Sequence, residues 1–313
     1  MTLRPTNKED LAQALRTANQ QQRTTGSIDL GALNRILEHT PEDMTVTVEA
    51  GVTLAALQIA LAQRGQWLPI DPPNPGSLTL AHLLSTNTSG PRRYGFGTIR
   101  DHLIGLEVAL ADGRLVRSGG KVVKNVAGYD LLKLFVGARD TLGLIVEATF
   151  KLLPLPETEH FVRARCPSLD DCRRVIDLVA ESELTPGVLD CHNVGADREG
   201  AFVVLGFSGT YEEVDWQLSR AATLGFVESC TLDHERRFWD DATSPAHRLS
   251  VLPSRVTEAM GKLGGIPFVA RAGNGVIYHR GDPLPLRMSE PATLLRRVKD
   301  TFDPNYILPE LPA

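Results

Sequence analysis

The sequence predicts an α+β protein with two domains, on three observations. The chain has 313 residues, and a domain usually holds about 100–200 residues. Segments with the alternation of strands and segments with the apolar spacing of helices are interleaved along it. Pro154 and Pro156 follow a long apolar strand. We therefore expect a first domain at residues 1–155 and a second at 156–313.

The first domain is expected to open with a helix and to be built around a sheet. Apolar residues at 11, 14, 15 and 18 predict a helix over 6–18. Residues 44–49 alternate between polar and apolar, as in a half-buried strand, and Thr53 can cap a helix over 54–64. Its other predicted elements are a helical patch at 80–84, strands at 103–110 and 115–117 joined by a turn at 112–113, a helical piece at 131–135 and a strand at 144–152.

The second domain alternates strands with amphipathic helices and has few polar clusters. The Asp303-Pro304 pair is expected to end its last helix, because proline cannot continue one. The other predicted elements are strands at 160–164, 202–207 and 268–278 and helices at 169–182 and 212–224.

Composition excludes several classes of partner. The 33 basic and 38 acidic residues give a net charge of −5, and no basic run of five occurs, so no nucleic acid or anionic membrane is expected as a partner. The four cysteines form no CxxC pair and are expected to be reduced thiols of a cytoplasmic protein. The sequence has no apolar signal region at its start and no apolar run near the roughly 20 residues that a membrane span requires.

Familiar nucleotide and metal motifs are also missing. Gly119-Gly120-Lys121 lacks the upstream glycine and the trailing hydroxyl residue of a phosphate loop, and Gly95-Phe96-Gly97 lacks a third glycine. The eight histidines show no HxH or HExxH spacing, and the adjacent Cys191-His192 pair is poorly placed to converge on one ion. No GxSxG elbow is present. We expect no metal site, Walker ATPase or Rossmann dinucleotide site.

Two long irregular stretches remain, at 68–100 and 118–130. Both are rich in glycine and small hydroxyl residues, and the first is also rich in proline. Loops longer than about 15 residues inside a compact domain are usually functional. Such loops suit a large ligand with a ring system and a diphosphate, or they are plain surface loops.

These stretches carry recognisable motifs. The runs GPRRYGFGTIRD, KNVAGYD and TLGLIVEATFKLLP, in this order, resemble the FAD-binding E subunit family of bacterial glycolate oxidase, within the vanillyl-alcohol oxidase/PCMH flavoprotein superfamily. The resemblance is close over 44–155 and continues weakly to RAGNGVIYH and FDPNYILP near the C-terminus. It implies a PCMH-type FAD-binding fold of two α+β subdomains, followed by a smaller α+β cap domain.

The resemblance also implies which residues would hold FAD. One loop would follow the flavin and the diphosphate, the next would bond the polar edge of the cofactor, and two residues would brace that loop. Further groups would lie near the ring or ribityl chain and on the adenine side. The loop along the flavin and diphosphate consists of Pro72, Pro73, Gly76, Ser77, Leu78 and Thr79, and the loop at the polar edge consists of Asn87, Thr88, Ser89 and Gly90, braced by Arg100 and Asp101. The residues near the ring or ribityl chain are Lys124, Asn125, Gly128 and Tyr129. Those on the adenine side are Gly143, Ile145 and Val146.

Two departures from the family pattern concern the cofactor. The strand and glycine-rich loop that wrap the pyrophosphate are missing near residues 20–26, and each lost charge-assisted hydrogen bond is worth about 1.5–3 kcal/mol. Ala81-His82 stands where the family usually has two glycines, so a Cβ and an imidazole would crowd the flavin. The usual covalent attachment site lies in the missing loop, so any FAD is expected to be non-covalent.

Two functions follow as expectations. The first is an FAD-dependent oxidoreductase subunit of the 2-hydroxy-acid oxidase/dehydrogenase type. It would act with a larger glycolate oxidase-like catalytic flavoprotein and an iron–sulfur subunit on a small 2-hydroxy acid. His82, Tyr129 and His279 have side chains that can act as a general base, but such residues are more often structural, and none is assigned this role. The alternative is a flavin-free scaffold subunit that kept the fold and lost the cofactor.

Overall fold

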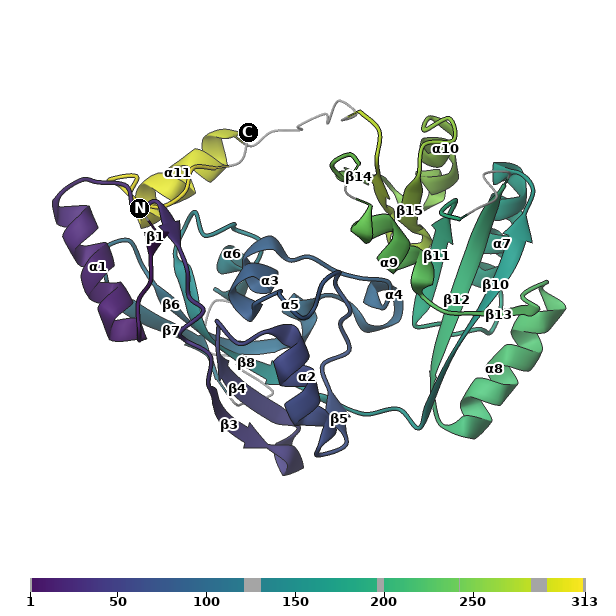
Figure 1. Cartoon of the computed structure of the whole chain (residues 1–313), viewed down its shortest axis with the longest axis horizontal. Helices are drawn as coiled ribbons and strands as arrows, with labels where there is room; N and C mark the ends of the chain where they lie inside the picture. The colour runs from purple at the N-terminus through teal and green to yellow at the C-terminus, as the bar shows by residue number, and fades with distance from the viewer. Residues whose placement is uncertain (1, 121–130, 196–199, 242, 283–291, 312–313) are drawn as a thin grey trace.

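The computed structural model describes residues 2–120, 131–195, 200–241, 243–282 and 292–311. It contains two large sheets with helices packed on them, one in each half of the chain (Figure 1). Within the described residues, no helix is both long and apolar enough to traverse a bilayer.

The first sheet has five antiparallel strands with β8 at its centre. One face carries Val48, Ala148 and Phe150, which are buried under the apolar sides of helices α2 (Leu54–Ala62) and α3 (Leu80–Thr86). The opposite face carries polar side chains, among them Thr47 and Thr149, whose hydroxyls lie 3.0 Å apart. In spatial order the strands are β3 (Ile36–Thr40), β4 (Thr45–Glu49), β8 (Leu144–Lys151), β6 (Leu103–Ala109) and β7 (Leu115–Gly119).

The amino-terminal elements pack on an edge of this half. Helix α1 (Lys8–Gln20) starts at Asn7, whose side chain accepts a hydrogen bond from the Asp10 amide. Strand β1 (Thr2–Leu3) pairs in parallel with β2 (Ser27–Ile28). A turn and a short extended stretch are all that connect α1 to β2, so residues 21–26 contain no strand.

The second sheet has seven strands and curves around a core of its own. Helices α7 (Leu169–Glu181) and α8 (Tyr211–Thr223) pack on it, each capped by the hydroxyl that precedes it, from Ser168 and Thr210. Helices α9 (Asp233–Asp240) and α10 (Val256–Gly261) complete this half. In spatial order the strands are β13 (Glu228–Cys230), β10 (Thr158–Cys166), β12 (Ala201–Gly209), β11 (Val188–His192), β15 (Phe268–Arg271), β16 (Val276–His279) and β14 (His247–Ser250).

Two features differ from the sequence-based expectation. The strand predicted at 268–278 is divided by a 3-10 turn at Ala272–Asn274, which Gly275 closes with a φ of 70°. The chain after residue 291 returns to the first half, where α11 (Ala292–Phe302) lies (Figure 1). There the Phe302 ring meets the edge of Phe135, which belongs to the short helix α6 (Leu132–Phe135), at 5.7 Å. Residues 292–311 thus pack with the first sheet and not with the second domain.

Candidate functional site

A loop at the carboxyl end of α3 holds two polar atoms that lack a partner. Asn87 ends the helix in the left-handed conformation, with a φ of 50°. Asn87 Oδ1 and the Ser89 hydroxyl are buried, and neither has a hydrogen-bond partner among the described residues. A buried polar group without a partner costs about 1–3 kcal/mol. The amide oxygen can only accept a hydrogen bond, whereas the hydroxyl can donate and accept, so the loop suits a ligand that carries both kinds of group.

A strained turn packs beside this loop. The amides of Gly137 and Arg139 donate to the carbonyls of Leu84 and Ser85, both at 2.8 Å. Gly137, Arg139 and Asp140 all have positive φ, of 81°, 52° and 61°. Strain of this kind at non-glycine residues is concentrated at functional sites. Local sequence does not reveal this turn: aspartate adopts the left-handed conformation more readily than most residues, but arginine gives no signal for it.

Asp140 lies near Ser85 and His82 of α3. Burial raises the pKa of the Asp140 carboxyl, while a hydrogen bond from the Ser85 hydroxyl and the nearby His82 oppose that rise. His82 is exposed, and the methyl group of Ala81 packs into the core instead.

A cavity of about 390 Å³ lies between the two halves of the chain. Its walls combine prolines and the indole of Trp239 with charged side chains. Burial raises the pKa of the Asp71 carboxyl to about 7, and the attraction of Arg92 opposes that rise. The charge on Asp71 thus depends on Arg92. The lining residues are Asp71, Pro72, Pro73, Asn74, Pro75, Pro91 and Arg92 from the first half, and Leu232, Glu235, Arg236, Trp239 and Asp240 from the second.

The other sequence-predicted residues fall into distinct environments. Gly76 and Ser77 are exposed, while Leu78 and Thr79 are half-buried at the start of α3. The Asp101 carboxylate accepts hydrogen bonds from the Thr98 amide and hydroxyl at 2.7 and 2.9 Å, so it caps the short helix α5 (Ile99–His102). Arg100 is exposed and Thr88 is half-buried. Four residues lie outside the described part of the chain: Lys124, Asn125, Gly128 and Tyr129.

Gly143, Ile145 and Val146 are core positions in and beside the central strand β8. The side chains of Ile145 and Val146 are buried in the first-half core. A Cβ on Gly143 would lie 2.6 Å from Val108 Cγ1, so glycine is required there by close packing. The Val146 carbonyl accepts a hydrogen bond from the Ala50 amide at 2.9 Å. Any contact of this segment with a ligand would therefore involve its backbone.

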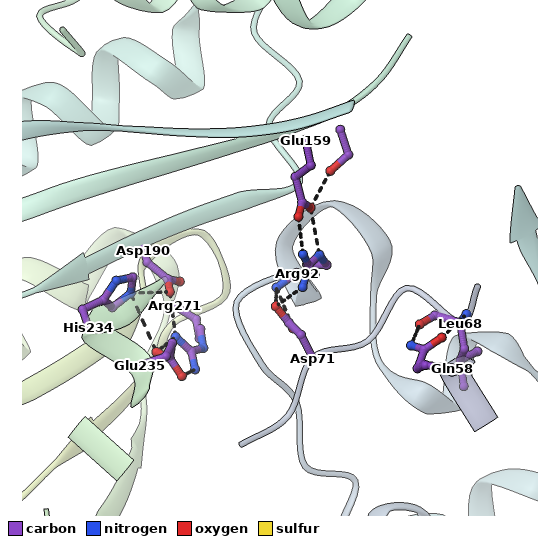
Figure 2. A network of polar contacts seen from close by, with 10 residues as sticks. Gln58, Leu68, Asp71, Arg92, Glu159, Asp190, His234, Glu235 and Arg271 are labelled. Carbon is purple, nitrogen blue, oxygen red and sulfur yellow. Dashed lines mark hydrogen bonds and ion pairs between the residues drawn. The ribbon is translucent and has the colours of Figure 1, made fainter. Parts of the chain in front are cut away.

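A buried cluster of charges lies in the second half, next to the cavity (Figure 2). Asp190, His234 and Glu235 place ligand atoms within 4.8 Å of one another. The guanidinium of Arg271 occupies the space that a cation would need, since its Nη1 lies 2.7 Å from Asp190 and its Nη2 lies 2.7 Å from Glu235. Although burial opposes it, Arg271 lowers the pKa of Glu235. The cluster is an ion-pair network, which the sequence analysis missed because its members are far apart in the chain.

The same cluster predicts a dependence of stability on pH. Burial, with repulsion from the stacked His234, lowers the pKa of His192 to about 2, against about 6.5 in an unfolded chain. The unfolded state therefore binds more protons below about pH 6.5, and the stability that neutral His192 provides is lost as the pH falls from about 6.5 toward 2. We expect His192→Phe to reduce the loss of unfolding free energy on acidification by up to about 1.4 kcal/mol per pH unit.

Urea unfolding of both proteins at about pH 7 and about pH 5.5 measures this difference. The phenylalanine keeps a ring between His234 and Phe202, whose centroids lie 4.1 and 5.5 Å from that of His192. Equal acid sensitivity of the two proteins would show that His192 is not held neutral.

Comparisons with known proteins agree with this geometry. Residues 1–119 match the family described as FAD binding domain. Glycolate oxidase subunit GlcD of Bacillus subtilis (strain 168) is 38% identical over 158 residues, which cover 50% of this chain and 34% of that protein. Glycolate oxidase subunit GlcE of Escherichia coli (strain K12) is 32% identical over 164 residues, which cover 52% and 46%. The D-lactate dehydrogenase of Archaeoglobus fulgidus is 35% identical over 150 residues, which cover 47% and 33%.

The chain thus spans between a third and a half of the length of these relatives. A solved structure of alkyldihydroxyacetonephosphate synthase superposes with a TM-score of 0.73 at 18% identity, over 98% of this chain and 75% of that one. This match supports the fold alone. The amino-terminal part of the chain thus matches the FAD binding domain family, and the α+β fold expected from the sequence is shared with this solved structure.

Proposed function

We propose that this protein binds FAD without a covalent link and is an oxidoreductase subunit for small 2-hydroxy acids, similar to the E subunit of glycolate oxidase. The observation that carries the proposal is a pair of buried atoms without a partner in the described part of the chain, Asn87 Oδ1 and the Ser89 hydroxyl, within the region that matches the FAD binding domain family. The relatives named as glycolate oxidase subunits and D-lactate dehydrogenases support the substrate class.

The residues present fit the flavin end of FAD better than its diphosphate. Asn87 Oδ1 can accept a hydrogen bond from an imide N–H or a ribityl hydroxyl, and the Ser89 hydroxyl can bond a polar ring edge or the same chain. When bound, FAD supplies the acceptor for a hydride from the carbinol carbon. The chain's contribution would be to orient the cofactor, and we assign no general base.

The connection between α1 and β2 offers the diphosphate little. Four of its backbone amides are already used: Gln21, Gln22 and Arg23 donate back to α1, and Thr25 donates to the Ile307 carbonyl at 2.9 Å. A diphosphate binds by collecting free N–H groups. We therefore expect weaker FAD binding than in a protein with a complete pyrophosphate loop, so that FAD is lost during purification and regained on addition.

Ser89→Ala is expected to change affinity and stability in opposite directions. Because the Ser89 hydroxyl has no partner among the residues that the structure describes, removing it should raise the unfolding free energy by about 1 kcal/mol and weaken FAD binding about 5–10-fold. Flavin fluorescence titration and urea unfolding of the FAD-free protein measure the two effects. Ser182→Ala is the matched control, since its hydroxyl already donates to the Val179 carbonyl at 2.7 Å and lies far along the chain; it should lose stability and leave FAD binding unchanged.

Asn87→Gly tests the second atom without straining the backbone, because glycine accepts the left-handed conformation. It should also weaken FAD binding. An absorbance spectrum before and after addition of excess FAD tests the proposal as a whole. A colourless protein that takes up no flavin would contradict it.

The four occupied amides within residues 21–26 favour a second candidate, a flavin-free scaffold subunit. In either case the proposed partners are a larger catalytic flavoprotein and an iron–sulfur subunit. Co-purification with these two subunits, combined with absence of flavin in this chain, would establish the scaffold function. Co-purification with flavin present would support the oxidoreductase.

A further inference from the structure

We propose that residues 91–97, the seam segment, lock the two halves of the chain in one orientation, and that Arg92 is the positioning residue that sets α9 over the Pro72–Pro75 loop. The segment belongs to the run that resembles a flavin-domain motif. In the structure its side chains and backbone contact the second half instead. The lock stands on its own geometry, and only its effect on catalysis rests on the proposed function.

The polar part of the lock is an arginine held by two carboxylates. Arg92 Nη1 lies 2.9 Å from Asp71 in the first half, and Arg92 Nε lies 3.0 Å from Glu159 on β10 in the second (Figure 2). The Arg92 amide also donates to Asp71 at 3.0 Å, and Ser208 donates to Glu159 at 2.8 Å. The Arg92 side chain is only 16% exposed. The strength of an ion pair with so little exposure to solvent depends strongly on its geometry. This bridge therefore fixes the orientation of the two halves as well as the distance between them.

The steric part of the lock consists of glycines that allow close approach. The Gly95 amide donates to the Gly187 carbonyl at 3.0 Å, which joins α4 (Arg93–Phe96) to the start of β11. A Cβ on Gly95 would lie 2.6 Å from Gly187 Cα, and a Cβ on Gly187 would lie 2.9 Å from the Phe96 ring. A Cβ on Gly273 would lie 2.0 Å from the ring of Tyr94. The halves therefore fit together in one arrangement, which any added carbon would disturb.

The lock controls the cavity between the halves. Asp71 and Arg92 belong to its wall, and Glu235 and Trp239 of α9 face them from the other side. If the second half rotated, the cavity would open and Tyr94 would leave the second core, while the buried residues of the two cores, which are different residues, would stay packed. Orientation of a substrate in such a cavity depends on wall positions to within about 1 Å.

Hydrogen exchange of the Gly95 amide is a direct test, since this amide bonds across the seam. In Arg92→Met, exchange of the peptide that contains residues 91–97 should become about 100-fold faster, because one buried partner of two carboxylates is lost. Arg92→Lys keeps one charge but not the fork that bridges both acids, so it should give an intermediate rate. Arg114→Met is the control: it breaks an ion pair with Asp112 that lies within the first half, with side chains 72% and 41% exposed, so seam exchange should not change.

Gly95→Ala opens the seam by contact alone and should also accelerate this exchange, with all charges kept. The pair Arg92→Met and Glu159→Gln should be non-additive, because both break one bridge. Slow exchange in Arg92→Met and in Gly95→Ala would overturn the lock, whatever their thermal stability.

No measurement here requires flavin. If the chain takes up no FAD, the proposed function fails and the exchange result stands. If FAD binds, Arg92→Met should lower kcat with little change in FAD affinity.

Discussion

Replacing Lys299 by methionine is expected to lower the free energy of unfolding by about 3–5 kcal/mol, because it leaves a buried carboxylate without its partner. The Lys299 side chain is 1% exposed and that of Asp303 is fully buried. Lys299 Nζ donates to Asp303 at 2.6 Å, to the Thr141 carbonyl at 2.8 Å and to the Pro309 carbonyl at 3.0 Å. One ammonium group thus joins α11, the terminal segment and the turn that precedes β8.

The chain contains a close control for this substitution. Lys262 and Glu258 form an ion pair with the same spacing of four residues, at 3.0 Å, but both side chains are about half exposed or more. Exposed pairs of this kind contribute about 0.3–0.5 kcal/mol. Urea unfolding should therefore show a large loss for Lys299→Met and a small one for Lys262→Met. Equal losses would mean that burial of the Lys299–Asp303 pair does not matter.

The return of the C-terminal segment was not predictable from local sequence. The pattern correctly predicted the end of α11 at Asp303-Pro304. The contacts that bring it back, Lys299 to Thr141 and Thr25 to Ile307, join residues more than 150 positions apart. Helical periodicity identifies an apolar face but not the surface that covers it. A domain boundary drawn at one point of the chain cannot represent a segment that returns.

The predicted elements were those with a clear period or cap. Thr53 caps α2 as expected, and β4, β6 and β8 agree with the predicted strands to within one residue at each end. Strand β11 was missed because its buried positions include Asp190 and His192, which interrupt the apolar run. Asp190 pairs with Arg271, and the ring of His192 stacks on the ring of His234. Buried polar residues can be assigned to a strand only when the partners that bind them are known.

In the candidate site, too, local motifs identify some residues, whereas contacts between distant segments are not predictable from them. The resemblance directed attention to Asn87 and Ser89, and each has a buried polar atom without a hydrogen-bond partner among the described residues. It also directed attention to Arg100 and Asp101 as braces of the loop, and the structure shows Asp101 as a helix cap. The contact of Arg92 across the seam is made with β10, which starts more than 60 residues later, and no sequence motif predicts it.

Gly90→Ala is expected to lower the free energy of unfolding by about 1–3 kcal/mol, through a collision with backbone. A Cβ on Gly90 would lie 1.8 Å from the Asp71 carbonyl oxygen and 2.3 Å from Asp71 Oδ1. Glycine here is required by close approach and not by backbone conformation, because its φ is not positive. To relieve the contact Asp71 must move, and the hydrogen bond that it accepts from the Arg92 amide would be lost.

Gly76→Ala in the same irregular stretch is the control. A Cβ on Gly76 would meet nothing within 4 Å, and its φ is also not positive. This substitution should leave stability unchanged or raise it by about 0.4–1 kcal/mol, because alanine restricts the unfolded chain. Thermal and urea unfolding of the two variants compare them directly. Equal stabilities would mean that the loop around Gly90 can shift freely. A large loss in Gly90→Ala alone, with faster exchange of residues 91–97, would show that the glycine holds Asp71 in the position that Arg92 needs.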